Sequence, residues 1–181
     1  MAITRLNTNA FGTSVNLASN VTGTLPTANG GTGATSFTKG KVLQFVNSEE
    51  QTSFATTSSS AVDTGISVSI TPTSASSKIL LTTNFNMRTL GNTYAGFLVY
   101  RQINGGGYSE LDRLEVANHY YINETISTIF YGKKVDTTHN TTNQIDYKID
   151  CNVQGGGSTL TVLIDSTSQL GNFTAMEIEA W

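Results

Sequence analysis

From Lys41 to the C-terminus the sequence repeats one pattern, a short run of alternating apolar and polar residues followed by a turn signal. In the clearest run, Ile66, Val68 and Ile70 are separated by serines. Alternation with a period of two places one set of side chains on each face of a β-strand. Turn signals follow as TPTSASS at 71–77 and as glycine triplets at 105–107 and 155–157. The repeat favours a chain built from strands and hairpins.

Strands that recur at roughly 10-residue spacing, with turns between them, are typical of antiparallel sandwiches. We expect about eight or nine of them. Residues 112–123 could instead hold a short helix, which is the less favoured reading. The fold class is therefore predicted as all-β, an antiparallel, jelly-roll-like β-sandwich head over residues 41–181. The runs at 41–46 and 51–57 are expected to form a first strand or a broken strand pair. The other strands are expected near residues 66–70, 78–87, 94–103, 108–116, 126–131, 144–151, 159–164 and 173–181.

Residues 1–40 have a different character, with almost no charge after Arg5 and no sustained periodicity. We therefore interpret them as extended and not helical. A single copy is expected to be disordered, because it cannot bury enough apolar area to offset the entropy of ordering. Within them, the stretch VTGTLPTANGGTGATSF combines apolar side chains with a proline and glycines that permit close backbone approach. Composition alone favours a linker. The alternative is a strand shared between chains, whose residues would be Val21, Leu25, Pro26, Gly30, Gly31, Gly33 and Phe37.

This stretch resembles a motif of bacteriophage tail-fibre proteins, of the form GTLPxxNGGTGATS. The residues that carry the match are Gly23, Thr24, Leu25, Pro26, Asn29, Gly30, Gly31, Thr32, Gly33, Ala34, Thr35 and Ser36. Weaker cues make the following domain similar to a terminal domain of phages of marine and freshwater bacteria. These cues are TGISVSITPTSASSKILL at 64–81, R-x-I-N-G at 101–105 and STLTVLID at 158–165.

The resemblance implies a homotrimeric virion fibre, made in the bacterial host cytoplasm and without enzyme activity. Residues 1–40 would be the anchor and stalk, and residues 1–20 would dock to a phage tail, baseplate or capsid protein. Three copies could interleave the apolar side chains of the stalk around a common axis and so order it. Because the stalk motif lies so near the first residue, a capsid-attached head fibre or decoration protein without a receptor role remains an alternative.

Composition excludes several other classes. Charged residues make up 13% of the chain and the net charge is −3, so there is no basic surface for nucleic acid or anionic membrane. No apolar run approaches the roughly 18–20 residues of a membrane span, and the N-terminus lacks the apolar stretch of a secretory signal. The single cysteine, Cys151, lies in an alternating run and is predicted to be a buried apolar residue without a disulfide.

Catalytic chemistry finds little support in the sequence. Glu110, Asp112, Glu115, Asp146 and Asp150 are the candidate carboxylates, and we expect them to be solvated surface charges. His119 and His139 have no ligand partner at i+2 or i+4, so neither a metal nor a cofactor is predicted. A carbohydrate-active domain is a third functional alternative, which would need carboxylates converging in a cleft.

The favoured binding candidate is a loop at 118–123. Tyr120 and Tyr121 could stack on the sugars of a host cell-surface glycan, with Asn118, His119 and Asn123 forming hydrogen bonds. The structural alternative places one tyrosine at a trimer interface and the other over the core.

Strand alternation predicts where this loop lies. If consecutive strands reverse direction, the loops near 71–77, 105–107, 137–143 and 166–171 share the end at which Gly40 enters. The loops near 58–63, 88–93, 118–125 and 152–158 would then lie at the far end together with Trp181, where a receptor would be met.

Overall fold

The structure is a computed structural model, and it describes residues 40–50, 53–90, 93–119, 125–154, 160–163 and 171–180. The chain divides into two units between Lys39 and Gly40, and the description that follows concerns the second unit. The predicted stalk, with Val21, Leu25, Pro26, Gly30, Gly31, Gly33 and Phe37, lies outside the described residues.

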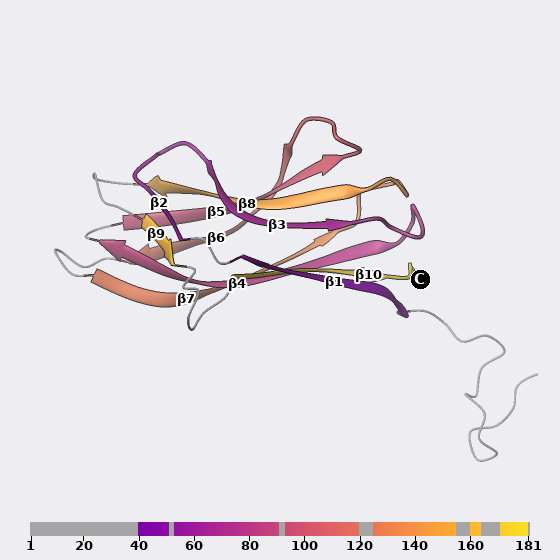
Figure 1. The fold of residues 1–181 in the computed structure, drawn as a ribbon, viewed down its shortest axis with the longest axis horizontal. Helices are drawn as coiled ribbons and strands as arrows, with labels where there is room; N and C mark the ends of the chain where they lie inside the picture. The colour runs from indigo at the N-terminus through magenta and orange to yellow at the C-terminus, as the bar shows by residue number, and fades with distance from the viewer. Residues whose placement is uncertain are drawn as a thin grey trace, which may run out of the picture. The chain divides into compact units, whose positions relative to one another are not determined.

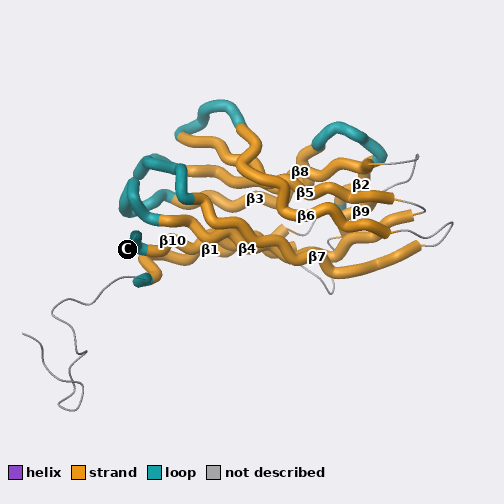
Figure 2. The backbone as a smooth tube through the Cα atoms, turned by 180° about the vertical axis from the view of Figure 1, so that it is seen from behind, coloured by secondary structure: helices purple, strands orange, loops and turns teal. Residues whose placement is uncertain are grey.

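Ten strands and no helix make up the described residues (Figures 1 and 2). Residues 109–119, part of which had a helix as an alternative, form a strand that pairs antiparallel with residues 93–101, and a register shift lets both Leu111 and Leu114 pack against the core. Accordingly, no helix in the described part is long and apolar enough to cross a membrane. The strands are β1 (Val42–Glu50), β2 (Phe54–Thr56), β3 (Val62–Ile70), β4 (Lys78–Leu90), β5 (Thr93–Ile103), β6 (Ser109–His119), β7 (Thr125–Asp136), β8 (Ile145–Gln154), β9 (Leu160–Leu163) and β10 (Gly171–Ile178).

These strands form two antiparallel sheets that lie one over the other (Figure 1). The larger sheet has the order β1-β10-β4-β9-β2, with β7 paired along β4. The smaller sheet has the order β3-β8-β5-β6. The predicted all-β antiparallel sandwich is confirmed.

Four of the strands are halves of two interrupted strands. On one edge of β4, β10 pairs with Lys78 to Asn84 and β9 pairs with Asn86 to Thr89, so the two run one after the other in the same direction. β1 and β2 follow the same course along β10 and β9. When β1 with β2, and β9 with β10, are each counted as one strand, the sandwich has eight strands in chain order. The larger sheet then has the order 1-8-3-6 and the smaller sheet the order 2-7-4-5. This is the connectivity of an eight-stranded jelly roll.

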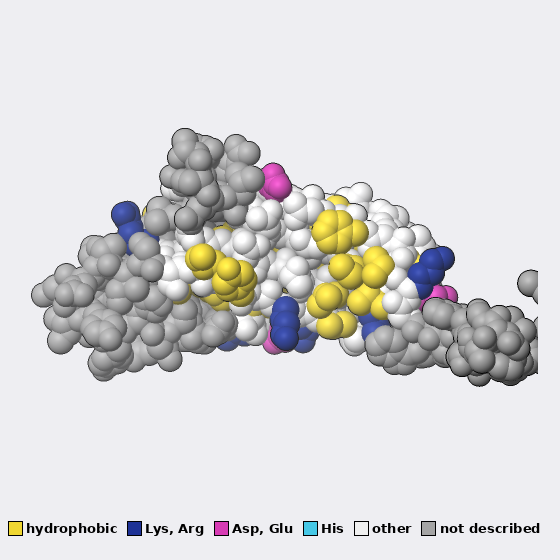
Figure 3. Space-filling view, turned by 90° about the horizontal axis from the view of Figure 1, so that it is seen from below, with side chains coloured by type: hydrophobic (Ala, Val, Ile, Leu, Met, Phe, Trp, Pro, Cys, Tyr) yellow, Lys and Arg dark blue, Asp and Glu magenta, His cyan; other side chains and the backbone are white. Residues whose placement is uncertain are grey.

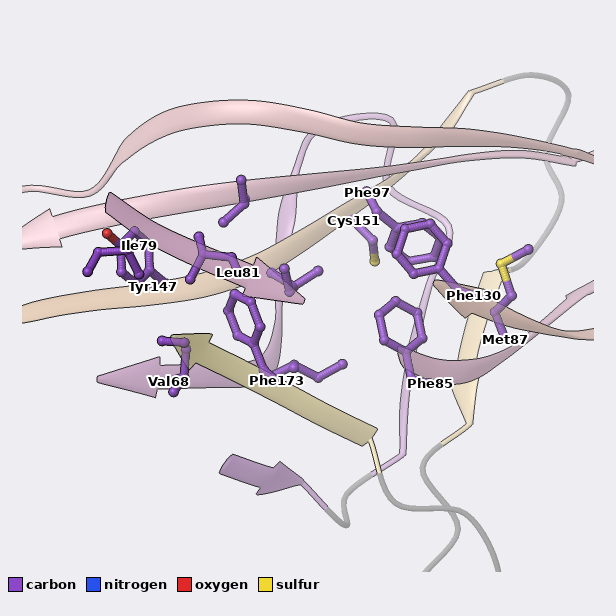
Figure 4. Packing of buried hydrophobic residues seen from close by; sticks show 14 of the residues in the cluster. Val68, Ile79, Leu81, Phe85, Met87, Phe97, Phe130, Tyr147, Cys151 and Phe173 are labelled. Atoms are coloured by element: carbon purple, nitrogen blue, oxygen red, sulfur yellow. The ribbon is translucent and has the colours of Figure 1, made fainter. Parts of the chain in front are cut away.

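The core lies between the sheets and is built by the alternation seen in the sequence. Ile66, Val68 and Ile70 are buried, and the serines between them are exposed. Phe85, Phe97 and Phe130 meet at its centre, with ring centroids 4.4 to 5.0 Å apart (Figure 4). Such aromatic contacts add to the stabilisation from burial alone. Cys151 is fully buried in the same cluster, as predicted.

The interrupted strands overturn part of the predicted loop placement. The loops at 71–77, 104–108 and 137–144 do lie at the Gly40 end, as shown by hydrogen bonds from Gln44 Nε2 to Thr71 O and from Asn104 N to Gln144 O. However, Gly171 pairs with Glu50 at the opposite end, and Ile178 pairs with Val42. The chain after β10 therefore leaves at the Gly40 end, because β9 and β10 run in one direction rather than reversing; the predicted far-end position of the C-terminal residues is wrong. Trp181 itself lies outside the described residues.

Candidate functional site

The outer face of the smaller sheet gathers the polar side chains of β8. Tyr147, Ile149 and Cys151 of this strand point into the core, so Asp146, Lys148, Asp150 and Asn152 point outward. Because β8 lies between β3 and β5, these four side chains occupy the middle of the face.

Lys148 is the centre of a compact group on this face. Its Nζ lies 3.0 Å from Asp63 Oδ2 and 2.9 Å from Asp150 Oδ1. It also lies 4.8 Å from the ring centroid of Tyr108 and 5.5 Å from that of Tyr100, which are cation–π distances. We call these five residues the lysine cluster; they join β3, β8, β5 and the chain leading into β6.

The hairpin between β5 and β6 places Tyr108 in the cluster. Asn104 and Gly105 have φ angles of 51° and 70°, and Gly106 N donates to Ile103 O at 3.0 Å. This is a type I′ turn, for which the Asn-Gly pair is the preferred sequence. The predicted turn at 105–107 is confirmed, with its tight part at Asn104 and Gly105.

Burial and hydrogen bonding set the charges of the cluster. Burial works against the charged ammonium, but hydrogen bonds to Asp150 and Asp63 outweigh it and raise the pKa of Lys148. Burial raises the pKa of Asp150, despite the neighbouring Lys148. Burial likewise raises the pKa values of Tyr100 and Tyr108. Lys148 therefore stays protonated at neutral pH and cannot act as a general base.

Beside the cluster, one buried oxygen lacks a partner. Asn152 is 7% exposed, and its Oδ1 accepts no hydrogen bond from the described residues. It lies directly over Gly96, where an added Cβ would collide with it and lie 3.1 Å from Arg113 Nη1. Asp150 Oδ1 also has no well-directed hydrogen bond within the described part, although Lys148 Nζ lies 2.9 Å away as an ion pair. Both oxygens are buried, so they are acceptors left without a hydrogen bond from the described residues.

The arrangement suits recognition rather than catalysis. Tyr108 is 42% exposed and the Asp63 side chain is 53% exposed, so a ring and a carboxylate are open to solvent beside a half-buried ammonium. An exposed tyrosine ring with polar neighbours can contact the apolar face of a sugar and hydrogen-bond to its hydroxyl groups. Both carboxylates that touch Lys148 are ion-paired to it. Within the described residues, no group of His, Cys, Asp and Glu side chains could hold a metal ion.

Two of the other predicted carboxylates and His139 make structural contacts. Asp112 pairs with Lys134, and Asp146 accepts hydrogen bonds from Ser69 and Gln144. Glu110 is exposed, as expected. The expectation that Asp150 is solvated is wrong, because this residue is only 6% exposed beneath Lys148. His139 is buried between the carbonyl oxygens of Ser77 and Thr141.

The predicted binding loop begins later than expected. Asn118 and His119 are the last residues of β6, where they pair with Tyr94 and Thr93 of β5. Tyr120, Tyr121 and Asn123 lie outside the described residues, and so do the side chains of Asn118, His119 and Glu115.

The lysine cluster is not among the sites predicted from the sequence. A signal was present, because Asp146, Lys148 and Asp150 put three charges on one phase of a strand in a charge-poor chain. The two tyrosines and Asp63 come from other strands, and their approach depends on sheet order and on the hairpin turn.

Two further buried carboxylates hold the loops of the Gly40 end. Asp136 accepts hydrogen bonds from Arg101, Tyr147 and the Thr138 backbone. Glu177 accepts bonds from Ser77 Oγ at 2.6 Å, Gln44 Nε2 at 2.7 Å and Thr73 N at 2.9 Å. Burial alone would raise their pKa values, but these hydrogen bonds outweigh it and lower both. Their role is structural.

No protein-family model matches the sequence, and no curated protein matches it. Among solved structures, the chain is similar to "Structure of infectious bursal disease virus Gt strain", with a TM-score of 0.44 and 11% identity over 75% of this chain and 41% of the other. A second is "The 2.6A structure of Infectious Bursal Virus Derived T=1 Particles", with a TM-score of 0.42 and 9% identity over 75% of this chain and 39% of the other. The chain thus spans less than half the length of these proteins. Scores and identities of this size transfer no function to this chain.

Proposed function

We propose that this protein is a bacteriophage virion fibre of the tail-fibre kind, and not an enzyme. Three copies share the stalk at 21–37, residues 1–20 dock to another virion protein, and each β-sandwich head takes part in recognition of the host surface. The observation that carries this proposal is the tail-fibre motif at 23–36, which lies directly before an all-β head. A threefold arrangement would also let three weakly binding heads act together through avidity.

The lysine cluster is the proposed glycan contact of the head. It offers an exposed ring at Tyr108 and the solvent-exposed carboxylate of Asp63. Aromatic rings with a polar end supply much contact area at low conformational cost, which suits a weak and repeated contact. The predicted residues Asn118, His119, Tyr120, Tyr121 and Asn123 are the competing contact within the same function.

The trimer is tested by the mass of the full-length chain in solution, measured by light scattering. We expect three copies per particle, and a stable monomer would rule the proposal out. Labelling of the assembled phage particle in electron microscopy separates a tail position from the capsid position of a head fibre or decoration protein.

Receptor binding is tested by competition, in which purified full-length protein blocks adsorption of the phage to host cells. Tyr108→Ala should weaken this block if the lysine cluster makes the contact. The double variant Tyr120→Ala, Tyr121→Ala should weaken it if the predicted loop at 118–123 makes the contact. Thr142→Ala, an exposed position at the Gly40 end, is the matched control. Unchanged blocking by both tyrosine sets would rule out these two contacts, and failure of the wild-type protein to block adsorption would remove host recognition from the proposal.

A further inference from the structure

The exposed apolar side chains of the head are concentrated on two strands. Six large apolar residues are exposed in the described part, and five of them lie on β1 or β7. Single exposed apolar residues are normal, whereas a concentration of them marks an interaction surface. The five are Val42 and Phe45 on β1, and Ile129, Tyr131 and Val135 on β7.

These two strands form the two outer rims of the larger sheet. β7 pairs only with β4, and β1 pairs only with β10, among the described strands. Figure 3 views this side of the molecule and shows hydrophobic side chains in separate groups on it. A row of apolar residues crosses the whole sheet, since Phe45 lies opposite Met176, Met176 opposite Leu80, and Leu80 opposite Val135.

The two rims are complementary rather than alike. The β1 rim presents Phe45, which is 60% exposed, and the acidic Glu49. The β7 rim presents Tyr131 and the basic Lys133. Those two residues also border an open hollow of about 500 Å³, whose other lining residues are Thr82, Thr83, Asn84 and Gly132. The β1 rim thus carries a protruding ring and an acid, whereas the β7 rim carries a hollow and a base.

We propose that the β1 rim of one head packs against the β7 rim of the next copy of this chain, with Phe45 directed toward Val135, which lies in the same row of the sheet. A contact between two different rims is heterologous, and such contacts close into rings when the rotation permits. β1 and β7 run in opposite directions in the sheet. If the copies are related by rotation about an axis parallel to the strands, β1 of one copy therefore meets β7 of the next copy in an antiparallel orientation. The inference rests on the proposed trimer and names its surface in the head.

The position of the rims favours another copy as the occupant. Val42 and Phe45 follow within a few residues of Gly40, the point where residues 1–39 join the head. Copies tied together through those residues would hold their β1 ends near one another. The polar side chains expected in a glycan site are instead gathered on the opposite face, around Lys148.

The test is thiol cross-linking of the full-length chain. Asn47 and Lys133 are exposed and lie in one row of the sheet, through Thr174 and Thr82. In the double variant Asn47→Cys, Lys133→Cys, a short bifunctional maleimide should give covalent dimers and trimers. The matched control is Ser67→Cys, Glu110→Cys, two exposed positions on the other sheet, which should give none. Adding Phe45→Asp to the Asn47→Cys, Lys133→Cys variant should abolish the covalent dimers and trimers. Circular dichroism confirms that this variant is folded.

The outcomes separate this inference from the trimer itself. A trimeric mass without cross-linking above the control overturns the rim contact and leaves the trimer standing. A monomeric mass overturns both. Dimers formed by Asn47→Cys alone or by Lys133→Cys alone would mean that like rims meet, which overturns the heterologous contact. Cross-linking in the double variant that Phe45→Asp removes supports the proposal.

Discussion

The Tyr147 hydroxyl donates a 2.7 Å hydrogen bond to Asp136 Oδ2 inside the sandwich. The Asp136 side chain is fully buried, and Arg101 Nη1 forms an ion pair with the same carboxylate at 2.8 Å. Strands β5, β7 and β8 are thereby joined at the Gly40 end of the head. A buried carboxylate is tolerated only when its charge is balanced and its oxygens are hydrogen-bonded.

Removing the two partners of Asp136 should have unequal effects. Arg101→Leu leaves a buried carboxylate without its counter-charge and should lower the free energy of unfolding by about 3–5 kcal/mol. Tyr147→Phe removes one hydrogen bond and should cost about 1–3 kcal/mol. Urea denaturation of both variants measures the difference. A smaller loss for Arg101→Leu than for Tyr147→Phe would contradict the balancing role of the ion pair.

Acid should destabilise the head through Asp136 and Glu177. Hydrogen bonds lower the pKa of each carboxyl in the folded state below its unfolded value. A lowered pKa contributes stability above the unfolded value, about 4 for these groups, and that contribution is lost as pH falls through the folded value. The melting temperature measured against pH should therefore fall steeply below about pH 4.

Glu177→Gln isolates one of the two groups. It should lower stability at neutral pH, because the amide cannot accept all the bonds from Ser77, Thr73 and Gln44. It should also flatten the acid dependence, since one titrating group is gone. An unchanged slope would assign the acid sensitivity to other carboxyls.

Gly96 should tolerate no side chain. An added Cβ would lie far inside contact distance of Oδ1 of the buried Asn152 side chain. Gly96→Ala should cost about 1–3 kcal/mol of unfolding free energy, as overpacking typically does. Gly107→Ala is the matched control, because nothing lies within 4 Å of its Cβ position and its φ angle is ordinary. Equal melting temperatures for the two variants would mean that Asn152 can move aside.

Cys151 should be unreactive in the folded protein. Burial raises the pKa of its thiol to about 12, so almost no thiolate is present at neutral pH. Ellman's reagent should detect one thiol per chain only after denaturant is added. Rapid labelling of the native protein would show that this part of the core opens frequently.

Much of the fold could be predicted because it depends on local periodicity. The alternation at 66–70, 79–87 and 145–151 gives strands whose buried faces agree with the predicted phases. A broken pair is among the predictions for β1 and β2, but the collinear pair β9 and β10 could not be predicted in this way. The run at 159–164 and the run from 173 each look like a complete strand, and only their shared pairing with β4 shows that they continue in one direction. Because β9 and β10 run in the same direction, the last residues of β10 lie at the Gly40 end of the sandwich and not at the predicted far end.

The candidate site was less accessible to sequence reasoning. The charges of β8 were visible, but Asp63 and Tyr108 come from positions 85 and 40 residues away from Lys148 in the chain. Asp150 shows the limit most clearly. Its alternation predicts an outward position, which is correct, yet it is buried there by its neighbours on the same outer face.

The neighbouring ends of β1 and β10 have a practical consequence. Glu179 N donates to Lys41 O at 2.9 Å, so the residue before β1 and the residue after β10 lie side by side (Figure 1). Domains whose ends are close together can be spliced into a surface loop of a host protein without stretching either one. We therefore expect residues 40–180 to act as a transplantable module, and a chimera that melts in two independent transitions would demonstrate it.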